Sequence, residues 1–331
     1  MLHKPQLPEV YRGHAGKLHT SSDGQKYGVA VESLNATYSF KYFGKDAGVS
    51  PYTFIDERHF LWHHEVISAS EREAAYVIDG LMHNNVIKSD IHSTDTHGYS
   101  EIIFGALHLL GFAFAPRMKT LTHQQLYGFR KRREYEQQGY QLLPDGYIKE
   151  SLIETQWDEM LRFIATIKLK ETTASQLFRR LNSYARQHPL YQALKEFGKI
   201  PKSDFILRVI DDVELRQAIE KQLNKGESAN KFSKAISFGN HHDFLYGEKV
   251  EQELAEGCRR LIKNAIICWN YVYLAQEENS ERRQELLTAV QHGSVVSWRH
   301  VNLHGEYDFS DEKMQDSIGL HIPPALALSV F

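Results

Sequence analysis

Three acidic residues of this sequence stand where a carboxylate can take part in chemistry: Asp23, Asp95 and Glu227. Asp23 lies on a run that reads as a central strand, and Asp95 ends a short extended run just before a helix. Such strand-to-helix junctions are common positions for sites in α/β proteins. Carboxylate oxygens suit Mg²⁺, which uses one or two of them and completes its shell with water and substrate phosphate. Two such ions about 4 Å apart activate an attacking oxygen and stabilise a leaving one.

Each of these residues also has a purely structural explanation. Asp23 lies in a Ser-Asp-Gly turn sequence, and Asp95 can accept hydrogen bonds from the backbone that follows it. Glu227 is predicted to open a helix, where the N-terminal turn stabilises negative charge. Lys231 and Lys234 follow on that helix and read either as phosphate-binding lysines or as partners in exposed Glu–Lys pairs. Only the combination of the three acids points to a site.

The hydrophobic periodicity predicts the elements that must position these residues. Short runs rich in aromatic and β-branched residues are too closely spaced for parallel crossovers and predict an antiparallel meander of three strands: 27–32, 37–43 and 52–55. Pro51 is among the residues expected to separate them. Residues 60–67 are a further candidate for extended structure. A helix over 70–83, a strand over 87–94, a helix over 101–110 ended by Gly111, and a strand over 112–116 follow. This order predicts an α/β fold in which helices cover a mixed sheet.

The second half of the chain reads as mostly helical. No strand is predicted between 121 and 223, and helical periodicity covers 157–169, 174–186 and 205–223. Lys225-Gly226 is predicted to break the pattern before a helix over 227–238. The longest predicted helix covers 250–273, with an apolar stripe made by Val250, Leu254, Cys258, Leu261, Ala265, Trp269 and Val272.

The bulk composition describes an ordinary globular protein, with 331 residues of which 42% are hydrophobic and 24% charged. No apolar run reaches the roughly 18 residues of a membrane span, and the start does not resemble a signal peptide. Cys258 and Cys268 read as two reduced core thiols of a cytoplasmic protein.

Other signals are weaker. Residues 117–234 carry an excess of basic side chains, which permits a polyanion partner or describes a solvated helical surface. Within them, Arg130, Lys131, Arg132 and Arg133 form a run that could meet DNA phosphates or end a solvated helix. Eighteen histidines invite a zinc interpretation, but no His-Glu-x-x-His or Cys-x-x-Cys motif supports it.

Six stretches in series resemble the catalytic part of the Tn3-family transposases. They are Ser-Asp-Gly-Gln at 22–25, Tyr-Val-Ile-Asp-Gly-Leu at 76–81, Thr-Asp-Thr-His-Gly-Tyr at 94–99, the two motifs within 109–117, Leu-Asn-Lys-Gly-Glu at 223–227, and the Trp-Arg-His-Val-Asn-Leu stretch with Gly-Glu-Tyr within 298–307.

This resemblance implies a DDE transposase with an RNase H-like core: a mixed sheet flanked by helices, with a large all-helical insertion before the third catalytic acid. Residues 1–118 would form the first part of the core, 119–223 the insertion, and 224–331 the last part with C-terminal helices and tail. Asp23, Asp95 and Glu227 match the three catalytic, metal-binding positions, with two Mg²⁺ ions expected and Mn²⁺ possible. Glu306 is the main rival of Glu227. The expected DNA-binding residues are Gln25, His97, Arg117, Arg130, Lys131, Arg132, Arg133, Lys231 and Lys234.

The implied activity is cleavage at transposon ends followed by attack of the freed 3′-hydroxyl on target DNA. The implied partners are the terminal inverted repeats and the target DNA, with a homodimer expected at full length and no membrane association. Family members are much longer, so this sequence is expected to be an N-terminally truncated fragment. The alternatives are a non-catalytic remnant, which binds DNA weakly or interferes with an intact transposase, and a stand-alone RNase H-like nuclease.

Overall fold

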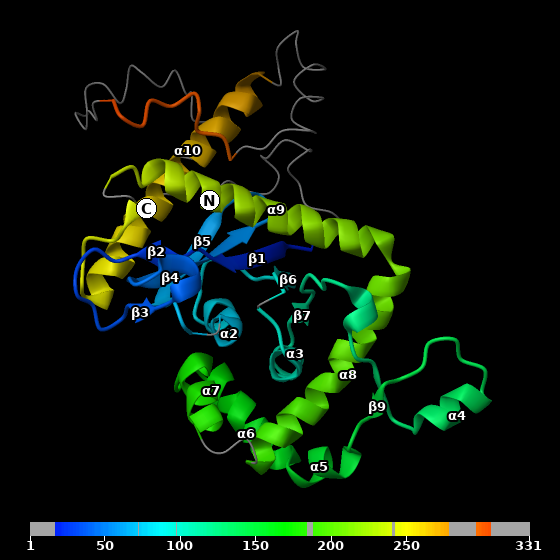
Figure 1. Cartoon of the computed structure of the whole chain (residues 1–331). Coiled ribbons are helices and arrows are strands. Elements are labelled where there is room, and N and C mark those ends of the chain that lie inside the picture. Colours follow the sequence, from blue (N-terminus) through cyan, green and yellow to red (C-terminus); the bar gives the residue numbers. More distant parts are fainter. Residues whose placement is uncertain are drawn as a thin grey trace.

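A mixed β-sheet of seven strands organises the structure (Figure 1), a computed structural model that describes residues 17–71, 73–96, 98–183, 188–239, 242–277 and 296–305. Its middle strands are β1 (His19–Gly24), β4 (Ala47–Asp56) and β6 (Ile91–Thr94). β1 pairs antiparallel with β4 and parallel with β6. The strand that carries Asp23 therefore lies inside the sheet, as the sequence predicts.

The outer strands complete an antiparallel meander on one side and a parallel extension on the other. β2 (Tyr27–Gly28), β3 (Thr37–Tyr38) and β5 (Leu61–Ser68) all pair antiparallel with β4, whereas β7 (Ala113–Phe114) pairs parallel with β6. The predicted mixed α/β architecture is confirmed at this level.

Two details of the meander differ from the prediction. The strand expected over 37–43 stops after Tyr38, and a short helix, α1 (Phe40–Phe43), follows. Pro51 does not separate strands but lies within β4, opposite Val66. A strand tolerates proline where no N–H is required, and the Pro51 carbonyl still accepts a hydrogen bond from the backbone N–H of Gln25 at 3.0 Å.

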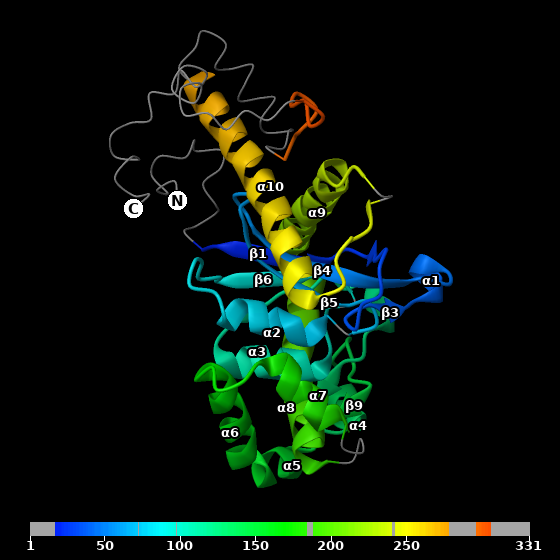
Figure 2. The same cartoon turned by 90° about the vertical axis from the view of Figure 1, so that its left-hand side faces the viewer.

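Helices cover both faces of the sheet (Figure 2). α2 (Ala74–Met82) and α3 (Glu101–Leu110) lie on one face and bury their apolar sides against it. Gly111 ends α3 in the left-handed region, with φ of 86°, where glycine is favoured. The opposite face is covered by α9 (Val213–Ile236) and α10 (Lys249–Glu277), which contact β1 and β5 respectively.

A helical region follows the last strand of the sheet and packs under α3. It contains the one-turn helix η4 (Leu121–His123), α4 (Arg132–Gln137), α5 (Glu150–Thr155), α6 (Trp157–Lys168), α7 (Ala174–Ser183) and α8 (Pro189–Asp211). The prediction that 121–223 lacks strands is wrong, because β8 (Tyr127–Gly128) pairs with β9 (Gly146–Tyr147). Strands of two residues are too short to show a hydrophobic period.

The predicted break at Lys225-Gly226 is also wrong. The helix boundary falls at Asp212 instead, whose side chain accepts a hydrogen bond from the backbone N–H of Leu215 at 2.8 Å and caps α9. α9 then runs through Gly226 without interruption. The expected boundary at residue 224 consequently falls inside a continuous helix.

The apolar stripe predicted to bury α10 faces outward instead. Val250, Leu254 and Leu261 are 80%, 70% and 70% exposed, while the polar residues Gln252, Glu256 and Lys263 on the other side are buried. Cys258 and Cys268 of the same helix are also exposed, so the prediction of two core thiols is wrong. Part of the physical reason for this orientation of α10 is the strand beneath the helix. β5 pairs only with β4 among the described strands, and the backbone groups of its free edge require partners.

Polar side chains of α10 provide those partners. Asn264 accepts from the Leu61 N–H at 3.0 Å and donates to the Leu61 carbonyl at 2.8 Å, and Glu253 accepts from the Val66 N–H at 2.7 Å.

Among the described helices, none combines the length and apolar character needed to cross a membrane.

Candidate active site

Asp23 and Asp95 emerge side by side from two neighbouring strands. Parallel pairing of β1 with β6 places Ser22 opposite Thr94, and each of these residues is followed directly by one of the two aspartates. The carboxyl ends of parallel strands lie at the same edge of a sheet, which is where open α/β sheets bind ligands. The fold thus brings together two acids that lie far apart in the sequence.

A buried histidine fixes this register. The ring of His92 on β6 is fully buried and forms hydrogen bonds with two side chains of β1, Thr20 Oγ1 at 2.7 Å from Nδ1 and Ser22 Oγ at 2.8 Å from Nε2. Burial, and secondarily the charge of His19, lowers the pKa of His92 to about 3, so its ring is neutral near pH 7.

The Asp23 carboxyl group occupies an environment that disfavours its charge. Desolvation, followed by the negative charges of Asp95 and Glu73, raises the pKa of Asp23 to about 7, and Glu227 adds a smaller effect in the same direction. Two hydrogen-bond donors favour the charged form of the carboxyl group instead. The Gly24 N–H lies 2.9 Å from Oδ1, and the Asn230 side-chain amide lies 2.8 Å from Oδ2. A group in this condition takes up a proton or favours a cation near neutral pH.

Glu227 reaches the same edge from the middle of α9 rather than from a helix start. The expected stabilisation by an N-terminal helical turn is therefore wrong. Positive charge comes instead from Arg117, whose Nη1 lies 3.8 Å from Glu227 Oε1 and 3.4 Å from Glu220 Oε2. Arg117 is anchored beside Asp95 because its backbone N–H donates to the Thr94 carbonyl at 2.8 Å. The two acidic side chains are half-exposed, at 51% and 50%.

Two residues at this edge were not singled out from the sequence. Glu73 lies so close to Gly24 that a Cβ added to Gly24 would come within 2.2 Å of Glu73 Oε1, and its charge raises the pKa of Asp23. Lys26 pairs with Glu73 at 3.3 Å. The second residue, Asn230, follows Glu227 by one helical turn and contacts Asp23 directly. That spacing on a predicted helix is the signal that could have identified Asn230.

The residues expected to bind DNA are spread over the molecule. Gln25 is engaged within the protein, since its amide nitrogen donates to the Asn230 carbonyl at 3.1 Å. Lys231 and Lys234 are exposed on α9. The basic run 130–133 is exposed at the start of α4, which lies on an arm well away from the ends of β1 and β6 (Figure 1). His97 and Glu306 lie outside the described residues.

The donor set at the strand ends fits a hard divalent cation in its chemistry. Mg²⁺ is commonly held by one or two carboxylates, with water and substrate oxygens in the other positions. Asp23 and Asp95 supply two such carboxylates. Burial, followed by the charge of Asp95, raises the pKa of Asp23, and a cation between the two groups would offset both effects. Within the described ranges, no three or more His, Cys, Asp or Glu residues are arranged as a metal-binding group.

Comparisons with known proteins agree in pointing to one family. A family model described as Tn3 transposase DDE domain matches residues 1–307. The chain is 35% identical over 318 residues to the transposase for transposon Tn1546 of Enterococcus faecium, covering 94% of this chain and 31% of that relative. It is 33% identical over 308 residues to the transposase for transposon Tn3926 of Escherichia coli, covering 91% of this chain and 31% of that relative. The chain therefore spans about a third of the length of these relatives.

Proposed function

Because the chain belongs to the family of Tn3 transposase DDE domains, we propose that it carries the catalytic site of a DNA transposase. The proposed activity is cleavage of DNA at transposon ends followed by transfer of the 3′-hydroxyl to target DNA. The observation that carries the proposal is the parallel register of Ser22 and Thr94, which places Asp23 and Asp95 at one edge of the sheet beneath α9. Asp23, Asp95 and Glu227 are the proposed catalytic residues.

Asp23 and Asp95 would hold a divalent cation, with Glu227 as the third carboxylate of the site. Bound Mg²⁺ or Mn²⁺, two ions in the proposal, would activate an attacking oxygen and stabilise the leaving one. The protein supplies the rest of the electrostatics. Arg117, which contacts Thr94 and the two glutamates of α9, would attract a DNA phosphate toward the acidic edge. Lys231 and Lys234 add exposed positive charge on the same helix.

The proposed core is RNase H-like. Its support is the antiparallel meander, the central position of β1 and the parallel strands β6 and β7 beyond it. Residues 119–223 would be a helical insertion between the strands and the helix of Glu227, with 1–118 and 224–331 as the two parts of the core. The predicted DNA contacts at Arg130, Lys131, Arg132 and Arg133 would then belong to the insertion.

The chain covers about a third of the length of its relatives. The complete activity of those relatives is therefore proposed for this chain rather than shown. Terminal inverted repeats and target DNA are the proposed partners, and a homodimer is proposed for the full-length protein. The relatives that match are each named as the transposase for a transposon, which supports the DNA partner. A non-catalytic remnant that binds DNA weakly is the alternative, and the same experiment separates the two.

The experiment uses a branched DNA in which a 3′-hydroxyl already lies beside the phosphodiester that it will attack. On this substrate the protein would catalyse the reverse of strand transfer. The reverse reaction needs no recognition of transposon ends, so the substrate suits the 331-residue chain. We expect a Mg²⁺-dependent resealed product that disappears in Asp95→Asn. Asp90→Asn is the matched control, because Asp90 is exposed just before the same strand and accepts a hydrogen bond from the Leu18 N–H.

The outcomes are distinct. Equal product from Asp95→Asn and the unaltered chain would remove Asp95 from the site and overturn the proposal. Absence of product from the unaltered chain, with measurable DNA binding, would favour the non-catalytic remnant. Cleavage of unbranched duplexes of arbitrary sequence would favour a stand-alone nuclease.

A further inference from the structure

The inward face of α10 carries a buried ion pair that the proposed chemistry does not use. Lys263 and Glu256 are 0% and 1% exposed, and Lys263 Nζ lies 3.4 Å from Glu256 Oε1. Removing both charges from water is expensive, and such a pair is rarely the most stable solution for a helix contact. A position-setting role explains a buried ion pair better than a contribution to stability does.

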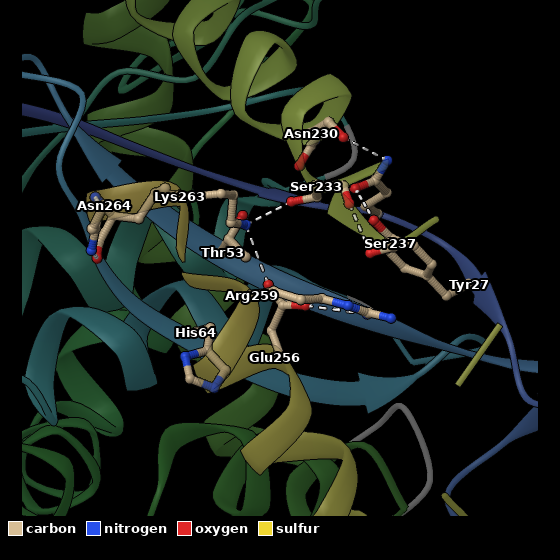
Figure 3. A network of polar contacts seen from close by, with 12 residues as sticks. Tyr27, Thr53, His64, Asn230, Ser233, Ser237, Glu256, Arg259, Lys263 and Asn264 are labelled. Atoms are coloured by element: carbon tan, nitrogen blue, oxygen red, sulfur yellow. Dashed lines mark hydrogen bonds and ion pairs between the residues drawn. The ribbon is translucent and has the colours of Figure 1, made fainter. Parts of the chain in front are cut away.

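The pair ties α10 to one particular turn of α9. Lys263 Nζ donates to Ser233 Oγ at 2.6 Å, and Figure 3 shows this bond together with the contact to Glu256. Ser233 is itself buried. A hydrogen bond between two buried side chains permits little sliding or rotation of one helix along the other. Lys263 therefore helps to set the axial position of α9 near Ser233, in addition to Gln222, which ties an earlier turn of α9 to Ser21 and Ile55 of the sheet.

The turn of α9 that precedes Ser233 carries Asn230, which contacts the proposed site directly. The Asn230 side-chain amide donates to Asp23 Oδ2 at 2.8 Å. Its backbone carbonyl accepts from Gln25 Nε2 at 3.1 Å, and Gln25 Oε1 in turn accepts from the Tyr27 hydroxyl at 2.7 Å. Figure 3 shows Asn230 and Ser233 on the same stretch of α9. The contact to Asp23 is thus held from both the helix and the sheet.

The chemistry of this contact suits a metal ligand. Each oxygen of Asp23 has one donor, since Gly24 N–H lies 2.9 Å from Oδ1 and Asn230 supplies the bond to Oδ2. Carboxylate ligands are oriented by hydrogen bonds of this kind. A lysine or arginine at position 230 would also orient the carboxylate, but its positive charge would repel an incoming cation. An asparagine orients Asp23 and adds no charge.

We propose that Asn230 is a positioning residue that holds the Asp23 carboxylate ready for a divalent cation, and that the Lys263–Ser233 contact keeps α9 where Asn230 can do so. This inference rests on the proposed function, because it requires a cation at Asp23. It adds three residues outside the acidic triad, Asn230, Ser233 and Lys263, and assigns α10 a part in building the site.

The test measures binding of Mn²⁺ to the 331-residue chain without DNA, by the electron paramagnetic resonance signal of free Mn²⁺ at constant pH. Asn230→Leu keeps the approximate side-chain size and removes the donor. We expect its Mn²⁺ affinity to fall roughly 10- to 100-fold, as losses of outer hydrogen bonds to metal ligands do. Asn224→Leu is the matched control, since Asn224 is an exposed asparagine of the same helix, and its affinity should equal that of the unaltered chain.

Two further variants complete the test. Lys263→Met removes the tie between the helices and should also weaken Mn²⁺ binding, although Asp23, Asp95 and Asn230 are unchanged; an unaltered affinity would overturn the role of α10. Asn230→Ala replaces Asn230→Leu if thermal unfolding shows that the leucine variant is not folded. An affinity of the Asn230 variant equal to that of Asn224→Leu overturns the positioning role.

Asp23→Asn separates this inference from the proposed function. If Asp23→Asn abolishes Mn²⁺ binding while the Asn230 variants bind normally, only the positioning inference fails. If Asp23→Asn binds Mn²⁺ as tightly as the unaltered chain, the cation is not at Asp23, and both the inference and the proposed metal site fail.

Discussion

Arg117 Nη1 lies between two glutamates of α9, 3.4 Å from Glu220 Oε2 and 3.8 Å from Glu227 Oε1. The two acids are matched in exposure and share one partner, but only Glu227 is proposed as a catalytic residue. Because both glutamates contact the same guanidinium group, substitutions of Glu220 and Glu227 can be compared directly to test which of them is the third acid of the site.

Glu227→Gln should reduce resealing of the branched DNA by roughly 100-fold or more, because a charge proposed to act in the transition state is lost. Glu220→Gln should leave the rate within about threefold, since it removes an equivalent half-exposed contact to Arg117 and no proposed ligand. The measurement is the single-turnover rate in Mg²⁺. Equal losses in both variants would show that the effect acts through Arg117 and would reopen the choice of the third acid.

Asp23→Asn should stabilise the metal-free chain above pH 7. The pKa of Asp23 is raised to about 7 in the folded chain, above its ordinary value. The stability that its protonated form contributes is therefore complete below the ordinary pKa and is lost as pH rises through about 7. Asparagine removes this loss, and we expect the variant to gain on the order of 1 kcal/mol in free energy of unfolding at pH 8. Urea unfolding at pH 4 and pH 8 measures the effect.

The test depends on whether Asp23→Asn raises or lowers the free energy of unfolding, and on how that difference changes with pH. The advantage of Asp23→Asn should disappear at pH 4, where the native carboxyl group is protonated, and saturating Mg²⁺ at pH 8 should stabilise the unaltered chain more than the variant. A variant that is less stable at pH 8 without metal would show that the hydrogen bonds to Asp23 outweigh its buried charge.

The buried histidine of β6 should contribute to acid sensitivity. The pKa of His92 is lowered to about 3, so its neutral form stabilises the fold fully above its ordinary pKa, and this stability is lost as pH falls toward about 3. His92→Gln should lower the free energy of unfolding by about 1–3 kcal/mol at pH 7, through lost packing and hydrogen bonds.

The same variant should show a shallower dependence of unfolding free energy on pH between 6 and 4, because one histidine that must take up a proton on unfolding is absent. Urea unfolding at half-unit pH steps gives this slope. His123→Gln, which replaces an exposed histidine, is the control and should leave stability at pH 7 unchanged. An unchanged slope in His92→Gln would contradict a neutral buried ring.

The helical region should detach from the sheet layer if the α3–α8 contact is opened. A Cβ added to Gly198 of α8 would lie 1.7 Å from the Glu101 carbonyl oxygen of α3, so the helices must separate. Gly198→Ala should lower the free energy of unfolding by about 3 kcal/mol. Gly239→Ala, at a position with open space around it, should change it by less than about 0.5 kcal/mol. Chemical denaturation followed by circular dichroism measures both.

Much of the fold could be predicted because local patterns carry it. The meander, the two αβ units and the end of α3 at Gly111 follow from short periodicities and from one residue with left-handed backbone. Elements without a local signal were missed. β8 and β9 are too short to show a period. α9 continues through Gly226, which is buried beside β1, and a Cβ added to it would make only an ordinary contact with Asp23 Cβ at 3.9 Å.

The sequence by itself determined which residues are candidates for chemistry and in which order they come: two aspartates at strand ends and a glutamate on a later helix, in a series of motifs that resembles one family. These are properties of residue type and short spacing. The tertiary structure alone decided which groups meet. Asn230 and Glu73 reach Asp23 only through helix packing, and α10 turns its polar side inward because the edge of β5 requires hydrogen-bond partners. Such choices depend on the unpaired groups of distant segments, which no local pattern contains.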